Sequence, residues 1–324
     1  MRPADAEYKN IVSEFSGNER PPIGRFAPSP TGKLHFGSLV SAVGSYLQVR
    51  RAGGLWLIRI EDLDPPRERA GAAAAQLTTL ARFGLLSDRP VQRQSRLRPR
   101  HDAAMRQLLR RQLAFHCACS RRDLPASGVY PGTCRRKPAD GRPARSVRFR
   151  VEPGQVRFVD LLRGPQNQVP AEQCGDFIIL RADGLIAYQL AVVVDDGASG
   201  VTEVVRGSDL LDSTGRQILL QEALGLPRPA YLHLPLIVDD QGRKLSKSRA
   251  DDPVERYCLR EALRLALRAL GHEPPAGVQS LESQWRWALK EWSIERIPTG
   301  PIAIDVQGCR RDDYTPSDDA PISL

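Results

Sequence analysis

The stretch GRFAPSPTGKLHFGSLVSAVGSY, residues 24 to 46, decides the fold. The apolar residues around its start predict a short buried strand over 23–27, and apolar side chains at helical spacing predict a helix over 37–53. LWLIRI, residues 55 to 60, then predicts a second strand. A strand, a helix and a strand in this order form a βαβ unit, whose strands are parallel. We therefore expect an α/β fold with a ligand crevice at the carboxyl ends of its strands.

The segment PSPTGKLHFGS between the first strand and the helix has the features of a phosphate-binding turn. Two prolines hold the backbone extended, Gly32 and Gly37 allow a ligand to approach closely, and a helix begins just beyond. His35 can donate to phosphate oxygens, an interaction that strengthens as charge builds up on phosphorus in the transition state. The alternative is that His35 only caps the turn, and this segment alone does not decide between the two.

KLSKS, residues 244 to 248, is the second candidate element of a nucleotide site. Its lysines, Lys244 and Lys247, follow a strand pattern and a glycine, so a loop that carries them can close over phosphates and neutralise a leaving pyrophosphate. Alone, KLSKS is more often an exposed basic turn. Together with the phosphate-binding turn, and in this order, it indicates one active site.

The remaining pattern completes the α/β domain. Strand patterns resume over 176–194 and 200–207, a helix is predicted over 210–224, and residues 70–115 and 251–292 are predicted to be largely helical. The chain is therefore divided into an N-terminal extension (1–21), the first half of the α/β domain (22–115), an inserted subdomain (116–175), the second half (176–235), the lysine loop with a helical stem region (236–310) and an acidic tail (311–324).

The net charge of +9 favours an acidic partner. Residues 89–111 hold eight arginines and one acid, Asp102, a composition that suits RNA, although a solvated helix face is the alternative. The chain has no run of 18 apolar residues, and its first residues lack the pattern of a signal peptide. We therefore expect a cytoplasmic protein without membrane contact.

HCACSRRDLPASGVYPGTC, residues 116 to 134, predicts a metal site. Cys117, Cys119 and Cys134 place three thiols within eighteen residues, and in a reducing compartment such a group favours zinc over disulfides. His116 and Cys174 are chemical candidates for a fourth ligand. A closed set of four ligands is structural and would stabilise an insert too small to fold alone. The alternative is a group of reduced cysteines packed in a loop.

Four segments together resemble the catalytic core of the class I glutamyl-tRNA synthetases: GRFAPSPTGKLHFGSL, RIEDLDPPR, YQLAVVVDDGASGVTEVVRGSDLLDSTGRQ and LPLIVDDQGRKLSKS. The resemblance covers about residues 22–248, with HFGS and KLSKS in place of the HIGH-like and KMSKS-like signatures of the family. It implies a Rossmann-like parallel sheet with a C-terminal helical stem region. It also implies that glutamate is adenylated at an ATP site with Mg²⁺ on the phosphates, and that no nucleophilic side chain is needed.

The resemblance also implies roles for individual residues. Glutamate contacts are expected from Arg25, Phe26, Ala27, Pro28, Ser29, Glu61, Tyr188 and Arg206. ATP contacts are expected from His35, Gly37, Ser38, Lys244 and Lys247, with His35 and Lys247 as the catalytic residues. The chemistry agrees, because two carboxylates suit arginines and an ammonium group suits one acid. Without this context, Arg206 is an ordinary arginine at a strand end and Glu61 an ordinary ion-pair carboxylate.

Two features are similar to one branch of the family, the glutamyl-Q tRNA(Asp) synthetases. The 76 residues after Ser248 are fewer than the 100 or so that an anticodon-binding domain needs, and Ser38 replaces the last histidine of HIGH. The branch implies activation of glutamate without tRNA and its transfer to queuosine at the wobble position of tRNA(Asp). It also implies one structural zinc held by Cys117, Cys119, Tyr130 and Cys134, and we expect a monomer.

Two other functions compete with this interpretation. A truncated glutamyl-tRNA synthetase would charge the 3′ end of a tRNA, and the short C-terminal region argues against it. A non-catalytic RNA-binding paralogue would retain the fold alone, and the intact KLSKS, RFAPS and RIED segments argue against that.

Overall fold

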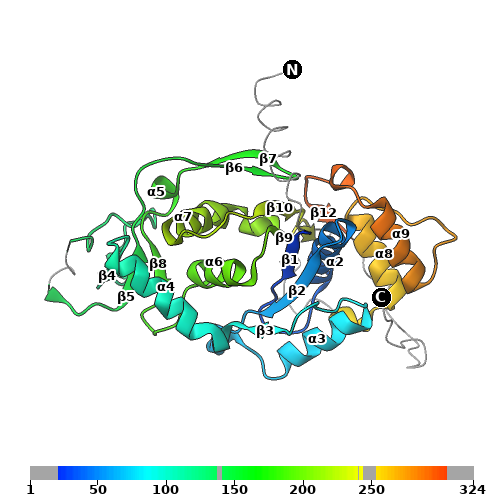
Figure 1. The fold of residues 1–324 in the computed structure, drawn as a ribbon, viewed down its shortest axis with the longest axis horizontal. Coiled ribbons are helices and arrows are strands. Elements are labelled where there is room, and N and C mark those ends of the chain that lie inside the picture. Colours follow the sequence, from blue (N-terminus) through cyan, green and yellow to red (C-terminus); the bar gives the residue numbers. More distant parts are fainter. Residues whose placement is uncertain (1–20, 137–140, 240, 244–252, 305–324) are drawn as a thin grey trace, which may run out of the picture.

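The structure is a computed structural model that describes residues 21–136, 141–239, 241–243 and 253–304 (Figure 1). Its centre is a seven-stranded sheet in the order β3-β2-β1-β9-β10-β6-β7. These strands are β1 (Ile23–Phe26), β2 (Leu55–Ile60), β3 (Gln92–Arg93), β6 (Val156–Asp160), β7 (Gly164–Gln168), β9 (Glu203–Gly207) and β10 (Ala230–Leu234). All neighbours pair in parallel except the hairpin β6-β7. The predicted α/β class is therefore confirmed.

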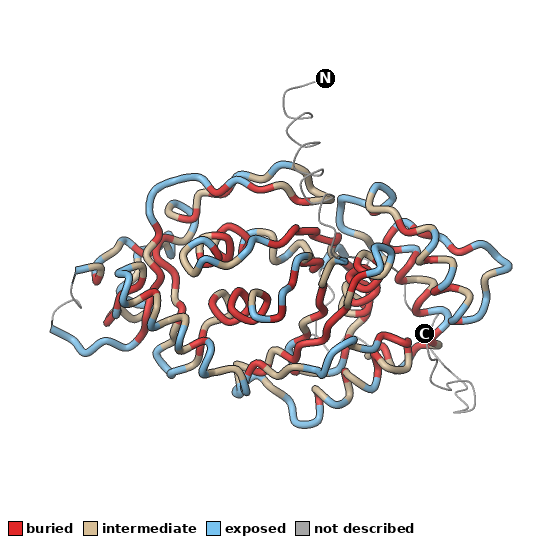
Figure 2. The backbone as a smooth tube through the Cα atoms, viewed as in Figure 1, coloured by how far each residue is buried: buried red, intermediate tan, exposed pale blue. Residues whose placement is uncertain are grey.

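The predicted βαβ unit is confirmed. Helix α2 (Phe36–Arg51) connects β1 to β2, and the two strands pair in parallel from Ile23 with Leu55 to Phe26 with Ile58. The apolar residues of α2 are buried. Figure 2 shows that buried residues are concentrated in the interior, where the helices contact the sheet. A Cβ atom on Gly44 of α2 would lie 2.7 Å from Leu234 Cδ1, so this glycine allows the helix to lie directly against β10.

The strand prediction over 176–194 is wrong in the second half of this range, which forms a helix. Strand β8 (Phe177–Leu180) is followed by helix α6 (Tyr188–Ser199), which ends at Gly200 in the left-handed conformation with φ of 70°. Most of α6 is buried, and an apolar run that is buried on several faces has no period that separates a helix from a strand. Strand β8 also leaves the parallel sheet and forms an antiparallel sheet with β4 (Ala114–Cys117) and β5 (Ser146–Phe149).

The hairpin β6-β7 falls within the range 116–175 that the sequence assigns to an insert. It nevertheless extends the central sheet, because Tyr231 of β10 pairs with Asp160 of β6. Further helices before residue 225 are α3 (Ala72–Arg82), α4 (Arg98–Arg110), the short α5 (Pro170–Gln173) and α7 (Thr214–Leu224). The helical regions predicted over 70–115 and 210–224 thus contain α3, α4 and α7, and the strand predicted over 200–207 is β9.

The C-terminal part is helical, as predicted. Helices α8 (Leu259–Ala269) and α9 (Leu281–Glu291) pack beside α2, and Trp285 is fully buried there and donates to the carbonyl oxygen of Phe83 over 2.8 Å. A small parallel sheet pairs β11 (Ile237–Val238) with β12 (Ile302–Ala303). The molecule is elongated, with α8 and α9 at one end and β4 and β5 at the other (Figure 1). Within the described residues, no helix is long and apolar enough to span a membrane.

Candidate functional site

A cavity of about 620 Å³ lies at the carboxyl ends of β1, β2 and β9, beside the start of α2. This volume is within the range of small-molecule and cofactor sites. Eleven residues predicted to contact glutamate or ATP line it: Arg25, Phe26, Ala27, Pro28, Ser29, His35, Gly37, Ser38, Glu61, Tyr188 and Arg206. The remaining two, Lys244 and Lys247, lie outside the described residues. Segments as far apart in the sequence as Arg25 and Ile237 therefore meet in one cavity.

His35 caps a helix and also lines the cavity. Its Nδ1 accepts a hydrogen bond from the backbone N–H of Ser38 over 3.3 Å, so the ring caps α2, and the same side chain lines the cavity. A neutral ring that accepts at Nδ1 carries its proton on Nε2, which is then a donor. A Cβ atom on Gly37 would lie 3.2 Å from this ring, so the glycine leaves room for it.

Arg25 is held from behind by an acid that the sequence analysis did not identify. Its Nε donates to both carboxylate oxygens of Asp196, over 3.1 and 3.2 Å, and Arg59 donates to the same carboxylate over 2.7 Å. Burial raises the pKa of Asp196, but the charges of Arg25 and Arg59 together outweigh it and lower the pKa below 3.8. Among the described residues, the terminal nitrogens of Arg25 have no hydrogen-bond partner. The planar fork of Arg25 is thus fixed at Nε with its terminal N–H groups available to a ligand.

Glu61 follows β2 and is the acid of the EDLD segment that lines the cavity. Its carboxylate lies 3.4 Å from Nη2 of Arg59, and its backbone N–H donates to the carbonyl oxygen of Pro28. Burial raises the pKa of Glu61, and the charges of Arg59 and Arg25 oppose this only in part. The carboxylate of its neighbour Asp62 instead accepts hydrogen bonds from the backbone N–H and the hydroxyl of Ser95. Glu61 is therefore the carboxylate of this segment that faces the cavity.

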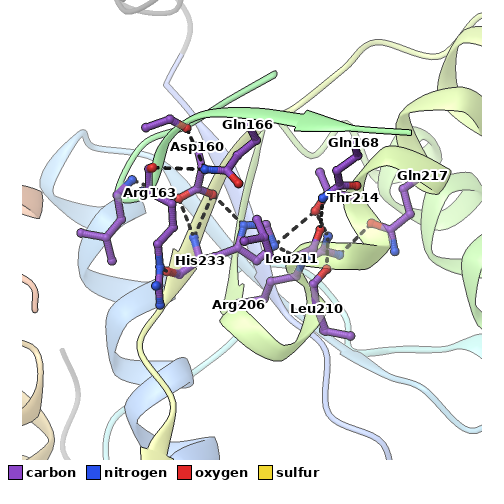
Figure 3. A network of polar contacts seen from close by, with 12 residues as sticks. Asp160, Arg163, Gln166, Gln168, Arg206, Leu210, Leu211, Thr214, Gln217 and His233 are labelled. Carbon is purple, nitrogen blue, oxygen red and sulfur yellow. Dashed lines mark hydrogen bonds and ion pairs between the residues drawn. The ribbon is translucent and has the colours of Figure 1, made fainter. Parts of the chain in front are cut away.

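Arg206 of β9 and Tyr188 at the start of α6 complete the cavity wall. Arg206 is only 5% exposed and belongs to a buried polar network with His233, Thr214 and Gln217 (Figure 3). Burial raises the pKa of Tyr188, so its hydroxyl stays protonated and is able to donate to an acceptor in the cavity.

The predicted metal ligands form a separate cluster near β4. The sulfur atoms of Cys117, Cys119 and Cys134 all lie within 4.8 Å of one another. The hydroxyl of Tyr130 lies 3.5 Å from the sulfur of Cys117 and 3.9 Å from that of Cys119. The structure thus brings Tyr130 to the thiols. The two competing ligands are elsewhere: the side chain of His116 is exposed, and the thiol of Cys174 donates to the carbonyl oxygen of Pro170.

The surroundings of the cluster fit a cation held by anionic ligands. Arg148 is 6% exposed, its Nε lies 3.4 Å from the sulfur of Cys117, and its guanidinium lies 3.9 Å from the ring centroid of Tyr130. Among the described residues it forms no ion pair with a carboxylate, since Asp176 is paired with Arg135. A buried guanidinium needs a counter-charge. Thiolates bound to a metal ion supply it, and three cysteine sulfurs are typical donors for zinc, to which Tyr130 would add a less common oxygen donor.

Three charged or polar residues that support the site escaped the sequence analysis: Asp196 behind Arg25, and His233 with Asp160 behind Arg206. A weak signal exists for Asp196, because Asp195-Asp196 directly follows the apolar run LAVVV, where a solvated face is not expected. His233 and Asp160 stand alone in strand patterns and have no such signal.

Comparison with known proteins shows the family of the chain. The family model described as tRNA synthetases class I (E and Q), catalytic domain, matches residues 23–127 and 132–282. The chain is similar to a protein of Chromobacterium violaceum named glutamyl-Q tRNA(Asp) synthetase, with 48% identity over 288 residues, which are 87% of this chain and 97% of that protein. A protein of the same name from Pseudomonas aeruginosa is 50% identical over 279 residues, covering 85% of this chain and 95% of that protein.

Solved structures show the same fold. A glutamate tRNA ligase from Elizabethkingia meningosepticum, in complex with its amino acid, superposes with a TM-score of 0.74 and 24% identity, over 88% of this chain and 67% of that chain. The glutamate-tRNA synthetase of Elizabethkingia anophelis also gives 0.74 and 24%, over 89% of this chain and 69% of that chain.

Proposed function

The chain belongs to the class I tRNA synthetases of glutamate and glutamine, and from this premise we propose that it activates L-glutamate with ATP, without tRNA, and transfers the glutamyl group to queuosine at the wobble position of tRNA(Asp). The observation that carries the proposal is the charge pattern of the cavity. Of the three arginines and two acids among the described residues that line it, Arg67 and Asp209 are exposed, whereas Arg25 and Arg206 are buried and the side chain of Glu61 is 9% exposed. The three inner groups are the complement of an amino acid with two carboxylates and one ammonium group.

In the proposed complex each charged group of glutamate has a partner. Glu61 binds the ammonium group, and the remaining N–H groups of Arg25 bind a carboxylate. Arg206 and the hydroxyl of Tyr188 bind the side-chain carboxylate. Ala27 and Ser29 in the turn after β1 also line the cavity. Glutamine lacks the second negative charge and aspartate is shorter, so both should fit this arrangement less well.

Adenylation then needs position and charge stabilisation. A carboxylate oxygen of glutamate attacks the α-phosphorus of ATP, a new phosphorus–oxygen bond forms, and the bond to pyrophosphate breaks. His35 donates from Nε2 to phosphate oxygens, beside Gly37 and Ser38 at the start of α2. Lys244 and Lys247 are proposed to neutralise the leaving phosphates. Mg²⁺, when bound, neutralises further charge on the phosphates. The carboxylate is already ionised, so no general base is assigned.

The second step transfers the glutamyl group. A nucleophilic group of queuosine attacks the carbonyl carbon of the adenylate, and AMP leaves. The names of the relatives support queuosine as the acceptor. We further propose that the enzyme acts as a cytoplasmic monomer and carries one zinc ion on Cys117, Cys119, Tyr130 and Cys134, with a structural role.

Pyrophosphate exchange in the absence of tRNA tests the activation step. The wild-type protein should incorporate labelled pyrophosphate into ATP with glutamate but not with glutamine or aspartate. Arg206→Ala should raise KM for glutamate by about 10- to 100-fold, because a charged hydrogen bond is lost. Arg216→Ala is the matched control, because Arg216 lies in α7, bonds to Ser213 and does not line the cavity. Pyrophosphate exchange that does not depend on glutamate, or an unchanged KM for glutamate in Arg206→Ala, would refute the pocket assignment.

A further inference from the structure

A buried histidine lies behind Arg206 and takes no part in the proposed reaction. His233 of β10 has no exposed surface, and its Nε2 lies 3.0 Å from Nε of Arg206. On the other side of the ring, Nδ1 lies 2.6 Å from a carboxylate oxygen of Asp160, which is also fully buried. Figure 3 shows the three side chains in line from β6 through β10 to β9. The row leads from β6, which lies beside the edge strand β7, to the cavity wall.

The hydrogen bonds around Asp160 determine which ring nitrogen carries the proton. Its carboxylate accepts the backbone N–H groups of Leu162, Arg163 and His233, as well as the contact with Nδ1. A carboxylate in this setting is an acceptor, so Nδ1 of His233 must donate. Burial lowers the pKa of His233 more than Asp160 raises it, and the charges of Arg206 and Arg163 lower it further, so the ring is neutral. A neutral ring with its proton on Nδ1 has a lone pair on Nε2, which accepts from Nε of Arg206.

The partners of Arg206 are all neutral. Its Nε donates to His233, one terminal nitrogen donates to Gln217, and the other donates to Thr214 and to the carbonyl oxygen of Leu210. These bonds use four of the five N–H groups of the guanidinium, so its orientation is fixed and one N–H group remains. Within the described part of the chain, no carboxylate forms an ion pair with Arg206. Its charge is therefore not compensated by the protein, in contrast to Arg25, which shares Asp196 with Arg59.

We propose that His233 and Asp160 are positioning residues for substrate recognition: Asp160 fixes the tautomer of His233, and His233 as a neutral acceptor holds Arg206 in place while it keeps the acid away from the guanidinium. A carboxylate in direct contact would satisfy the charge of Arg206 and weaken its preference for an anionic substrate. The neutral ring instead leaves that charge for the side-chain carboxylate of glutamate. This inference rests on the proposed glutamate pocket.

Two substitutions separate the acceptor from the packing. In His233→Gln, the side-chain carbonyl oxygen can take the place of Nε2 and accept from Arg206, so KM for glutamate should stay within about threefold of the wild type. In His233→Leu, the ring is replaced by an apolar group and Nε of Arg206 loses its acceptor, so KM for glutamate should rise by about tenfold. KM for ATP should not change in either variant. His272→Leu is the control, because His272 is also buried, accepts from the backbone of Ser293 and does not line the cavity.

Pyrophosphate exchange with these variants tests the proposal. The proposal is supported if KM for glutamate rises in His233→Leu, stays near the wild-type value in His233→Gln and does not change in His272→Leu. An unchanged KM in His233→Leu overturns it. Should His233→Leu not fold, ¹⁵N NMR of the wild-type protein, with His233→Gln for assignment, provides the test. A non-protonated Nε2 on His233 is required, and a proton on that nitrogen contradicts the proposal. Absence of glutamate-dependent exchange in the wild type would refute the proposed function but would leave the tautomer result standing.

Discussion

At the scale of single residues, the site depends on how buried charges are paired. Arg25 and Arg59 share the carboxylate of Asp196, and all three side chains are less than 10% exposed. A buried arginine without an acid is costly, so Asp196 stabilises the fold and also fixes Arg25 at the cavity. The sequence predicts Arg25 by resemblance, but Asp196 lies 171 residues away, and only the folded chain shows that the two are paired.

Asp196→Asn should be strongly destabilising. The substitution leaves the buried guanidinium of Arg25 without a carboxylate and Arg59 with only its longer contact to Glu61, and breaking a buried ion pair typically costs about 3–5 kcal/mol. Urea denaturation measures the free energy of unfolding, and KM for glutamate in pyrophosphate exchange should rise as Arg25 loses its support. Asp183→Asn, at an exposed ion pair with Arg181, is the control and should change neither quantity measurably. A free energy of unfolding within about 1 kcal/mol of the wild type would show that Asp196 has no such role.

The buried histidines should make stability depend on pH. The pKa of His233 is lowered below 6.5, mainly by burial, so the native ring is neutral while the unfolded chain takes up a proton below about pH 6.5. Its contribution to stability is thus complete above pH 6.5 and is lost as pH falls toward the native pKa. Denaturation at pH 7.5 and pH 5.5 should show a smaller loss for His233→Gln than for the wild type. Some loss should persist, because burial lowers the pKa of His272 as well. Equal losses in both proteins would be inconsistent with a buried neutral His233.

At the scale of elements, the sequence predicts those helices and strands that follow from a residue pattern within one segment. The unit from β1 through α2 to β2 follows from apolar spacing within one segment, and the structure confirms it. Helix α6 was missed because its apolar run is buried on several faces, so that only tertiary packing separates it from a strand. The hairpin β6-β7 joins the sheet through β10, which comes more than sixty residues later, and this pairing has no local signal. The cavity residues were predicted by resemblance, whereas the network of Asp160 and His233 needed the structure.

The cysteine cluster should behave as a metal-dependent element. Most of the described residues between β4 and β5 lie outside helices and strands, so a bound ion would contribute much of the stability of this segment. Cys134→Ser should lose about one zinc per chain by metal analysis and should make the segment sensitive to proteolysis, as should a strong chelator on the wild type. Cys258→Ser is the control, because Cys258 lies outside the cluster. A wild-type protein without metal, or Cys134→Ser with unchanged metal content, would refute the zinc site.

At the scale of the whole molecule, shape and charge suit a large anionic partner. Strands β1 and β9, whose carboxyl ends line the cavity, lie between β4 and β5 at one end and α8 with α9 at the other (Figure 1). Six of the eight arginines between 89 and 111 are exposed, namely Arg89, Arg96, Arg100, Arg106, Arg110 and Arg111. The two partly buried ones, Arg93 and Arg98, form ion pairs with Asp62 and Asp102. The predicted basic surface is thus present, although sequence alone does not show which arginines form ion pairs.

Transfer of labelled glutamate from ATP and glutamate to tRNA tests the central claim most directly. Two tRNA pools should be compared, one from cells that make queuosine and one from cells that cannot. The proposed function predicts label only in the queuosine-containing pool, on tRNA(Asp). Equal label in both pools would contradict it and would indicate charging of the 3′ end, and no label in either pool would indicate a protein that binds RNA without catalysis.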